Sequence, residues 1–475
     1  MNRTRRLSKR SQLIVIGVLA LALAACGTTA AEGGGGGGGG GDSTPTPTTP
    51  SPTTPGATPS GATPPKDQQI TFAESGLGTE GEQTAAAIED FERLNPTIKV
   101  DIQVLSPDST TYLQQLQQRF IAGSTTPDVL ESDVTYPAKF AQAGWIMSLG
   151  AVHPDLTRYF PGAVAAGQYD GKTYAIPWFV NPEGLFYRTD LVPSPPTSPV
   201  EVVADAEEAM EKDPALKEGL AFEGAKYEGA ITAWLTVNSA FGGKLTTSSI
   251  ASPGNVASLG WLHDAIYTEK IAPQAVVGWQ EGQVQQEFTS GHTAFAIDYP
   301  FVEAVAEQGG PAKGHVGYIP FPAAPGGTPG AALGGEMLAI NAKSTHVAAA
   351  WKLIEYLTSP SVEIARAVAT GDPPSLTSAY TSALYAKAPY FKEVKRLNEY
   401  AQPRPITSDY LQVSSILQSS LSSVFANLAT PSAALSSAAS QIAGGAGAGR
   451  ASALRADGTV GSPRGLERAG GSGAA

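Results

Sequence analysis

Residues 87–104 read AIEDFERLNPTIKVDIQV, and their pattern is the clearest indication of secondary structure in the chain. Ala87 and Phe91 fall at helical spacing, and the Asn-Pro pair at 95–96 ends that helix because proline disfavours a helical residue before it. From Ile98 to Val104 apolar and polar residues alternate, which predicts a strand with one buried face. The stretch is therefore a helix that leads directly into a strand.

The same alternation continues on both sides of this stretch. A strand is expected to begin at Ile70, a helix to run through Leu113 and Phe120, and a short strand to lie at Val129–Leu130. Residues 168–174, QYDGKTY, predict a hairpin around Asp-Gly. Strands that alternate with helices indicate an α/β protein with a mainly parallel, helix-covered sheet, and such sheets bind ligands at the carboxyl ends of their strands.

The first 26 residues have the pattern of an export signal. Five basic residues precede an apolar run at 13–25, which is too short to span a bilayer. The run ends in Leu-Ala-Ala-Cys, and Cys26 is the only cysteine of the chain. This ending resembles the lipobox of bacterial lipoproteins, so we expect 1–25 to be a lipoprotein signal peptide and Cys26 to carry the lipid. The alternative is a plain secretory signal with a chance cysteine.

Charge and cysteine content narrow the classes of function. The export signal holds five of the 31 basic residues and none of the 43 acidic ones, so its removal leaves a net charge of −17. This charge argues against binding to nucleic acid or adsorption to anionic lipid. A single cysteine allows no intramolecular disulfide, so the fold must depend on burial of apolar surface.

Two segments of low complexity flank the expected folded region. Residues 26–65 combine the lipidated cysteine with a nine-glycine run at 33–41 and a Thr/Pro stretch, and we expect a disordered linker. Residues 442–475 are rich in Gly, Ala and Ser and predict a disordered tail.

Motifs for catalysis and cofactors find little support. The five histidines lack zinc spacing, and residues 76–81 match a dinucleotide fingerprint whose expected acid, Asp101, lies inside a strand. We therefore expect no metal, no cofactor and no enzyme activity. An extracytoplasmic glycosidase remains an alternative, because the separation of its two carboxylates is spatial and a sequence does not reveal it.

Aromatic, amide and charged residues near the expected strand ends predict a sugar site. Sugar rings pack on aromatic faces, and their hydroxyls pair with carboxylates, amides and arginine. The candidates are Glu74, Asp133, Trp178, Asn181, Tyr227, Tyr299, Phe301 and Arg404.

A series of short motifs between Ile70 and Ser440 resembles the substrate-binding lipoproteins of ABC sugar importers, of the extracellular family 1 type. The motifs are FERLNPTIKV at 91–100, PDV at 127–129 with Asp133, FAQAGW at 140–145, YAIPW at 174–178, LFYRTDL at 185–191, FTSGHTAF at 288–295, LGG at 333–335, AIN at 339–341, AAW at 349–351 and YLTS at 356–359.

Two further segments narrow the resemblance. FEGAKYEG at 222–229 and RPITSDY at 404–410 are similar to the trehalose/maltose-type branch, in which these segments lie near the sugar. The resemblance implies further ligand contacts from Glu228, Asp298, Gly334, Gly335 and Glu336. Relatives often carry an aromatic or small residue where this chain has Glu336, which leaves the particular sugar open.

The resemblance implies two lobes joined by hinge strands, with a central ligand cleft that closes on the ligand. We expect one lobe at 66–180 plus 331–376 and the other at 181–330 plus 377–441. The expected protein is a monomer outside the cytoplasm, anchored to the cell membrane through Cys26. It would capture a sugar, such as the disaccharides trehalose or maltose, and deliver it to an ABC permease. Other small polar solutes remain alternatives: a glycerol phosphate, an amino sugar or an oligosaccharide.

Overall fold

A computed structural model describes residues 67–75, 78–106 and 109–456. The expected signal peptide at 1–25, the lipidated Cys26 and the linker to residue 65 lie outside the described residues. Among the described residues, no helix combines the length and the apolar character needed to cross a membrane.

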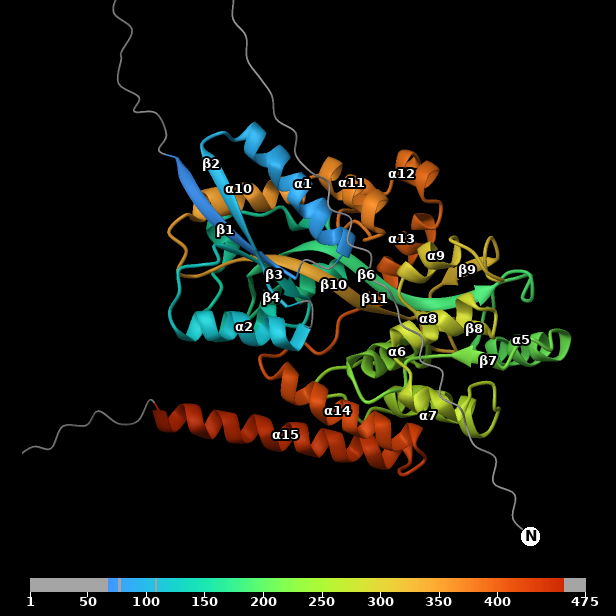
Figure 1. The fold of residues 1–475 in the computed structure, drawn as a ribbon. Helices are drawn as coiled ribbons and strands as arrows, with labels where there is room; N and C mark the ends of the chain where they lie inside the picture. The colour runs from blue at the N-terminus through green and yellow to red at the C-terminus, as the bar shows by residue number, and fades with distance from the viewer. Residues whose placement is uncertain (1–66, 76–77, 107–108, 457–475) are drawn as a thin grey trace, which may run out of the picture. The chain divides into compact units, whose positions relative to one another are not determined.

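The first part of the described chain forms the strands and helices that the sequence predicts. The strand β1 pairs in parallel with both β2 and β3. Ile70 and Phe72 of β1 are buried on the side of α1 and α10, and Ala73 faces the opposite cluster with α2 (Figure 1). The elements are β1 (Gln68–Glu74), α1 (Gly78–Leu94), β2 (Ile98–Val104), α2 (Ser109–Ile121) and β3 (Val129–Asp133).

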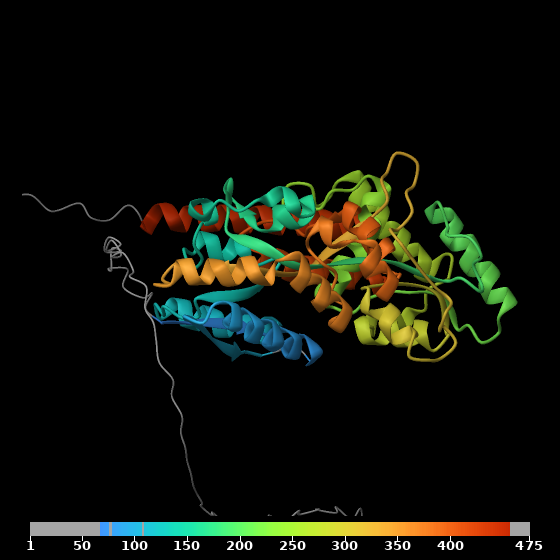
Figure 2. The same cartoon turned by 90° about the horizontal axis from the view of Figure 1, so that it is seen from above.

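Two long strands, β6 (Ala175–Arg188) and β10 (Ala331–Ile340), connect the two parts of the sheet (Figures 1 and 2). The first half of β6 pairs with β10, and its second half pairs with β8 (Thr293–Asp298) and β9 (Val316–Ile319). The sheet order is β2-β1-β3-β10-β6-β8-β7, where β7 is Glu218–Ala221. We call β1–β3 and the helices that pack on them, among them α1, α2 and α10, the β1 half. We call β7–β9 and the helices that pack on them, among them α6, α14 and α15, the β8 half.

The expectation of a mainly parallel sheet is wrong, because the sheet is mixed. β10 runs antiparallel to β3 and β6, and β6 runs antiparallel to β8 and β9. Within the described residues, only the ladders β1–β2, β1–β3, β7–β8 and β10–β11 are parallel, where β11 is Ala401–Gln402. Local periodicity predicts a strand but not its direction, and direction here follows from the two strands that cross between the halves.

The remaining elements cover the two halves. Between β3 and β6 lie α3 (Pro137–Gln142), η1 (Leu149–Val152), η2 (Leu156–Arg158), α4 (Pro161–Ala166), β4 (Gln168–Tyr169) and β5 (Lys172–Thr173). Between β6 and β10 lie α5 (Pro199–Lys212), α6 (Glu228–Asn238), η3 (Ser239–Phe241), α7 (Pro253–Tyr267), η4 (Gln274–Gly278), α8 (Glu281–Thr289) and α9 (Phe301–Ala306). After β10 come α10 (Val347–Leu357), α11 (Pro360–Thr370), η5 (Thr377–Ala379), α12 (Ser382–Lys387), α13 (Phe391–Tyr400), β11 (Ala401–Gln402), α14 (Tyr410–Phe425) and α15 (Pro431–Ala456).

The hairpin expected at 168–174 is confirmed. β4 and β5 pair antiparallel across Asp170 and Gly171, whose φ angles are 48° and 68°. Two positive φ values in a two-residue loop define the primed turn that Asp-Gly favours.

The expectation of disorder from residue 442 is wrong as far as residue 456. Helix α15 continues to Ala456 and lies along α14 in Figure 1. Leu435, Ala438 and Ile442 are buried against the core of the β8 half. Leu435 and Ala438 precede the expected tail, and Ile442 is its first residue, so these side chains at helical spacing dock the part of α15 up to residue 442. Residues 457–475 lie outside the described residues.

Candidate ligand-binding site

The ends of β1 and β3 meet β10 and β6 where these strands cross between the halves. The register of β10 places Glu336 opposite Asp133 of β3 and Gly334 opposite Asn181 of β6. Glu74 is the last residue of β1 and is buried. The sheet thus brings together five residues that the sequence singled out from separate segments, with Gly335 between two of them.

A cavity of about 200 Å³ opens at this place. Four of its lining residues were expected: Asp133, Asn181, Gly335 and Glu336. The others are Ser75, Glu80, Ser106, Tyr112, Glu131, Tyr136 and Phe179. Acids, an amide and aromatic rings are the groups that bind a polyhydroxylated ligand.

Gly335 shapes the floor of this cavity. Its φ of 112° lies in the region that favours glycine, and a Cβ atom there would lie 2.3 Å from the carbonyl oxygen of Phe179. Neither a positive φ nor this close approach suits another residue, so the crossing of β10 and β6 requires glycine here.

Burial raises the pKa of most carboxyl groups around the cavity. It raises the pKa of Glu74 to about 7 and, together with the nearby Asp372, that of Glu80 to about 8. It also raises the pKa of Glu131, and it raises that of Glu336 well above its usual range with help from the charge of Glu131. A carboxyl group that holds a proton can donate one hydrogen bond as well as accept others.

Arg366 contacts residues that line the cavity, and sequence reasoning did not identify it. Its guanidinium lies 3.0 Å from Asp372 and 3.9 Å from Glu80, and its Nη1 donates to Thr84 at 3.1 Å. It also packs over the rings of Trp178 and Phe179, at 4.2 and 4.7 Å from their centroids. Stacking and ion pairs together fix the positions of two lining residues, Glu80 and Phe179.

Trp178 and Phe301 lie apart from the cavity. Trp178 is 2% exposed and packs edge-on against Phe72 at 5.8 Å, within the core of the β1 half. Phe301 begins α9, is 40% exposed and is absent from the cavity lining.

A second group of acids lies in the β8 half, where β6, β7 and β8 meet. Asp298 ends β8 and accepts a hydrogen bond from the backbone N–H of Tyr299 at 2.7 Å, and Tyr227 donates to Glu223. The sequence predicted Asp298, Tyr227 and Tyr299 but missed Glu223 and Glu183. Glu183 is fully buried one residue before the point where β6 pairs with Asp298.

Burial controls the protonation of this second group too. It raises the pKa of Glu183 to about 8, and it raises the pKa values of Glu223 and Asp298 well above their usual range, each with a smaller contribution from Glu183. Within the described residues, one oxygen of Glu223 and one of Asp298 have no hydrogen-bond partner. Burial therefore shifts the protonation equilibrium of these carboxyl groups toward the neutral form.

Arg404 lies between the two groups of acids. It is 7% exposed, and its Nη1 donates to Glu228 at 2.9 Å while its Nη2 lies 3.7 Å from Asp133. Gly334 and Tyr299 also meet here, since a Cβ atom on Gly334 would lie 3.0 Å from the Tyr299 ring. Residues predicted in both halves thus converge on this guanidinium.

The residues that sequence reasoning missed differ in the signals they carry. Glu80 lies in the first turn of a helix that follows a strand, a position that could have marked it as a site residue. Glu131 and Glu183 lie inside strands, where an acidic residue normally indicates a solvent-facing side. Their burial depends on strands that lie far apart in sequence.

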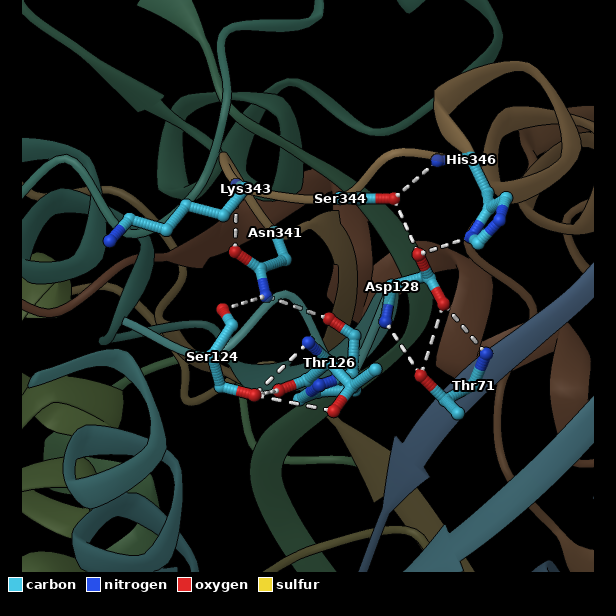
Figure 3. Close-up of polar contacts among 9 residues, drawn as sticks. Thr71, Ser124, Thr126, Asp128, Asn341, Lys343, Ser344 and His346 are labelled. Carbon is cyan, nitrogen blue, oxygen red and sulfur yellow. Dashed lines mark hydrogen bonds and ion pairs between the residues drawn. The ribbon is translucent and has the colours of Figure 1, made fainter. Parts of the chain in front are cut away.

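A third polar cluster lies at the opposite end of β3 (Figure 3). Asp128 Oδ2 accepts from the backbone N–H and hydroxyl of Thr71, at 2.9 and 3.1 Å. Its Oδ1 accepts from Ser344 at 2.5 Å and lies 3.3 Å from His346 Nδ1. Nearby, the Asn341 amide donates to the carbonyl of Pro127 at 3.0 Å. Both oxygens of Asp128 are occupied by protein groups, so Asp128 joins β1 and the start of β3 to the loop that follows β10.

No group of three or more His, Cys, Asp or Glu in the described part of the chain is arranged to hold a metal ion.

Comparison with known proteins gives the class to which this architecture belongs. The family described as bacterial extracellular solute-binding protein matches residues 75–364, more than half of the chain. The chain belongs to this family, whose members are the binding components of ABC transporters.

Relatives along almost their whole length support this assignment. A probable ABC transporter-binding protein of Deinococcus radiodurans is 30% identical over 393 residues, 79% of this chain and 93% of the relative. Maltose-bound MalE3 of T. maritima is 31% identical with a TM-score of 0.69, over 79% of this chain and 99% of that one. The sugar-binding protein MalE of Xanthomonas citri is 25% identical with a TM-score of 0.69, over 79% and 96%. The expected two-lobed binding-protein fold is confirmed. The assignment of the chain to the trehalose/maltose-type branch stays a prediction.

Proposed function

We propose that this solute-binding protein captures a disaccharide such as trehalose or maltose outside the cytoplasm and delivers it to an ABC permease. The observation that carries the proposal is the cavity where Asp133, Asn181 and Glu336 meet beside Arg404. The relative of known structure that is 31% identical binds maltose, which agrees with this choice.

The lining of the cavity favours a neutral sugar over a phosphorylated solute. It includes four carboxyl groups, one amide and three aromatic residues, but no lysine or arginine. A phosphate group would need several cations in direct contact, whereas protonated and ionised carboxyl groups suit hydroxyls that both donate and accept.

Closure of the two lobes would complete the site. We propose lobes at 66–180 plus 331–376 and 181–330 plus 377–441, with β6 and β10 as the hinge strands and Arg404 at the junction. A ligand that binds the closed form more tightly would shift the population toward closure, and the permease would read the closed surface. We propose a monomer that is tethered to the membrane by a lipid on Cys26.

A thermal-shift screen followed by calorimetric titration tests the ligand class. Trehalose, maltose, glucosamine and glycerol 3-phosphate represent the competing chemistries. A ligand at a hundred times its Kd stabilises the folded state by about 2.7 kcal/mol, which is easily visible as a rise in Tm. Binding of glycerol 3-phosphate alone would contradict the proposal. Release of glucose from either disaccharide would instead indicate a glycosidase.

A further inference from the structure

Glu228 has both of its carboxylate oxygens engaged by other protein groups. Its Oε1 accepts hydrogen bonds from Arg404 Nη1 at 2.9 Å and from the Tyr410 hydroxyl. Its Oε2 accepts from the Ser414 hydroxyl at 2.5 Å. Three donors around one carboxylate leave little capacity for a ligand hydroxyl.

The donors come from one short stretch of chain that packs on α6. Tyr410 and Ser414 lie four residues apart at the start of α14, so they share one helix face, and α14 packs against α6. Glu228 is the first residue of α6, where the helix dipole favours a negative charge. Glu228 therefore ties residues 404–414 to the N-terminus of α6 within the β8 half.

Arg404 also lies near an acid of the other half, because its Nη2 is 3.7 Å from Asp133 in the β1 half. Burial raises the pKa values of Glu183 and Glu281, and the positive charge of Arg404 opposes that rise. An arginine side chain has many rotamers, and without Glu228 the guanidinium could turn toward Asp133. Among the described residues, Arg404 Nε has no hydrogen-bond partner, which leaves a donor for a ligand oxygen.

We propose that Glu228 is a positioning residue, which holds the Arg404 guanidinium between the two halves and does not itself contact the ligand. This inference rests on the proposed function only in making Arg404 a ligand contact. It changes the role that the sequence suggested for Glu228, from direct hydrogen bonding to orientation of a neighbouring cation.

A double-mutant cycle tests this role with maltose and trehalose as the probes. Affinity is measured by calorimetry for wild type, Glu228→Gln, Arg404→Ala and the double variant. Each single change is expected to weaken binding about tenfold, and the double variant to bind no more weakly than Arg404→Ala. If Glu228→Gln weakens binding by the same factor in the Arg404→Ala background, Glu228 contacts the ligand directly and the inference is wrong.

A second measurement needs no ligand and separates this inference from the proposed function. The Nε–H signal of Arg404, assigned by its loss in Arg404→Lys, is followed by NMR hydrogen exchange. Arg404 Nε is buried and has no hydrogen-bond partner among the described residues, so its N–H is protected by burial. Exchange should accelerate at least about tenfold in Glu228→Gln, because the guanidinium loses the charged partner that holds it in place and its Nε–H then meets water. An unchanged Arg404 signal would overturn the inference, even in a protein that binds neither sugar.

Milder variants cover the case in which Glu228→Gln does not fold. Tyr410→Phe and Ser414→Ala each remove one donor to Glu228 and leave the Glu228–Arg404 contact in place. Both are expected to accelerate Arg404 exchange by a smaller factor. Unchanged exchange in both variants would show that the contacts anchoring Glu228 do not orient Arg404, which contradicts the inference.

Discussion

Asp128 joins three segments of the chain through its two carboxylate oxygens. It is 2% exposed, and its donors come from β1 and from the loop between β10 and α10 (Figure 3). A buried carboxylate that accepts several hydrogen bonds stabilises the fold, because its removal leaves those buried donors without an acceptor.

We predict that Asp128→Ala destabilises the protein by about 2–4 kcal/mol, since the Thr71 N–H and the Ser344 hydroxyl lose their acceptor inside the fold. Urea unfolding measures this change. His346→Ala is the matched control: it removes a partly exposed partner at 3.3 Å and should cost less than about 1 kcal/mol. An equal loss of unfolding free energy in both variants would show that the stabilising effect of Asp128 depends on His346.

The buried carboxyl groups of the β8 half should make stability depend on pH. The pKa of Glu183 is raised by burial from 4.5 to about 8, so the folded state holds a proton that the unfolded state releases above pH 4.5. Stability from this group is fully present below pH 4.5, falls as the pH rises toward 8, and changes no further above it.

We predict that Glu183→Gln flattens this decline and makes the protein more stable than wild type at pH 8, by an amount on the order of a few kcal/mol. The amide of glutamine is uncharged and has nearly the same shape as the protonated carboxyl group. The free energy of unfolding, measured from pH 5 to pH 9, gives the slope for both proteins. A variant slope as steep as that of wild type would assign the pH dependence to other groups.

At the scale of elements, β10 depends on glycine where it crosses β6. We predict that Gly335→Ala destabilises the protein by at least about 2 kcal/mol, because its φ of 112° and the Phe179 carbonyl at 2.3 Å both exclude a Cβ atom. Ligand affinity should fall too, since Gly335 lines the cavity.

Gly260 is the control for this substitution. It lies within α7, and a Cβ atom there would meet nothing within 4 Å. Gly260→Ala should therefore stabilise the protein by about 0.5–1 kcal/mol. Thermal unfolding compares the two variants, and the same sign of change in both would contradict the role assigned to Gly335.

Two truncations in helix α15 test how far the folded region extends. Deletion of residues 431–475 should destabilise the protein by about 3–6 kcal/mol, because Leu435 and Ile442 leave the core of the β8 half. Deletion of 445–475 should have little effect, since Gly, Ala and Ser bury little apolar area. The Tm values of the two truncated proteins test this prediction. A large drop in Tm on deletion of 445–475 would show that part of the core lies beyond residue 444.

At the scale of the whole molecule, we predict that Cys26→Ala abolishes retention on the membrane and leaves the folded part intact. A single cysteine at the end of an apolar run is the expected site of the lipid, and a Gly- and Pro-rich linker separates it from β1. Cell fractionation with a thermal melt of the released protein measures both. Membrane association at the wild-type level would contradict a lipid on this residue.

The sequence by itself determined the α/β class, the hairpin at 168–174 and the family. The helix and strand at 87–104 follow from local periodicity, which needs no contact with the rest of the chain. Several site positions also followed, because Asp133 and Glu74 end strands that meet at one edge of the sheet.

The direction of β6 and β10, the docking of α15 and the set of residues that line the cavity follow from tertiary contacts and not from local sequence. The sequence around Glu131 and Glu183 does not distinguish them from solvent-facing strand residues, yet both are buried. The sequence around Trp178 suggests a ligand contact, yet this residue lies in the core. Which carboxyl group lies beside which is a matter of distances between segments remote in sequence. Burial, which raises the pKa values of these groups, is created by the packing of those segments and is absent from local sequence pattern.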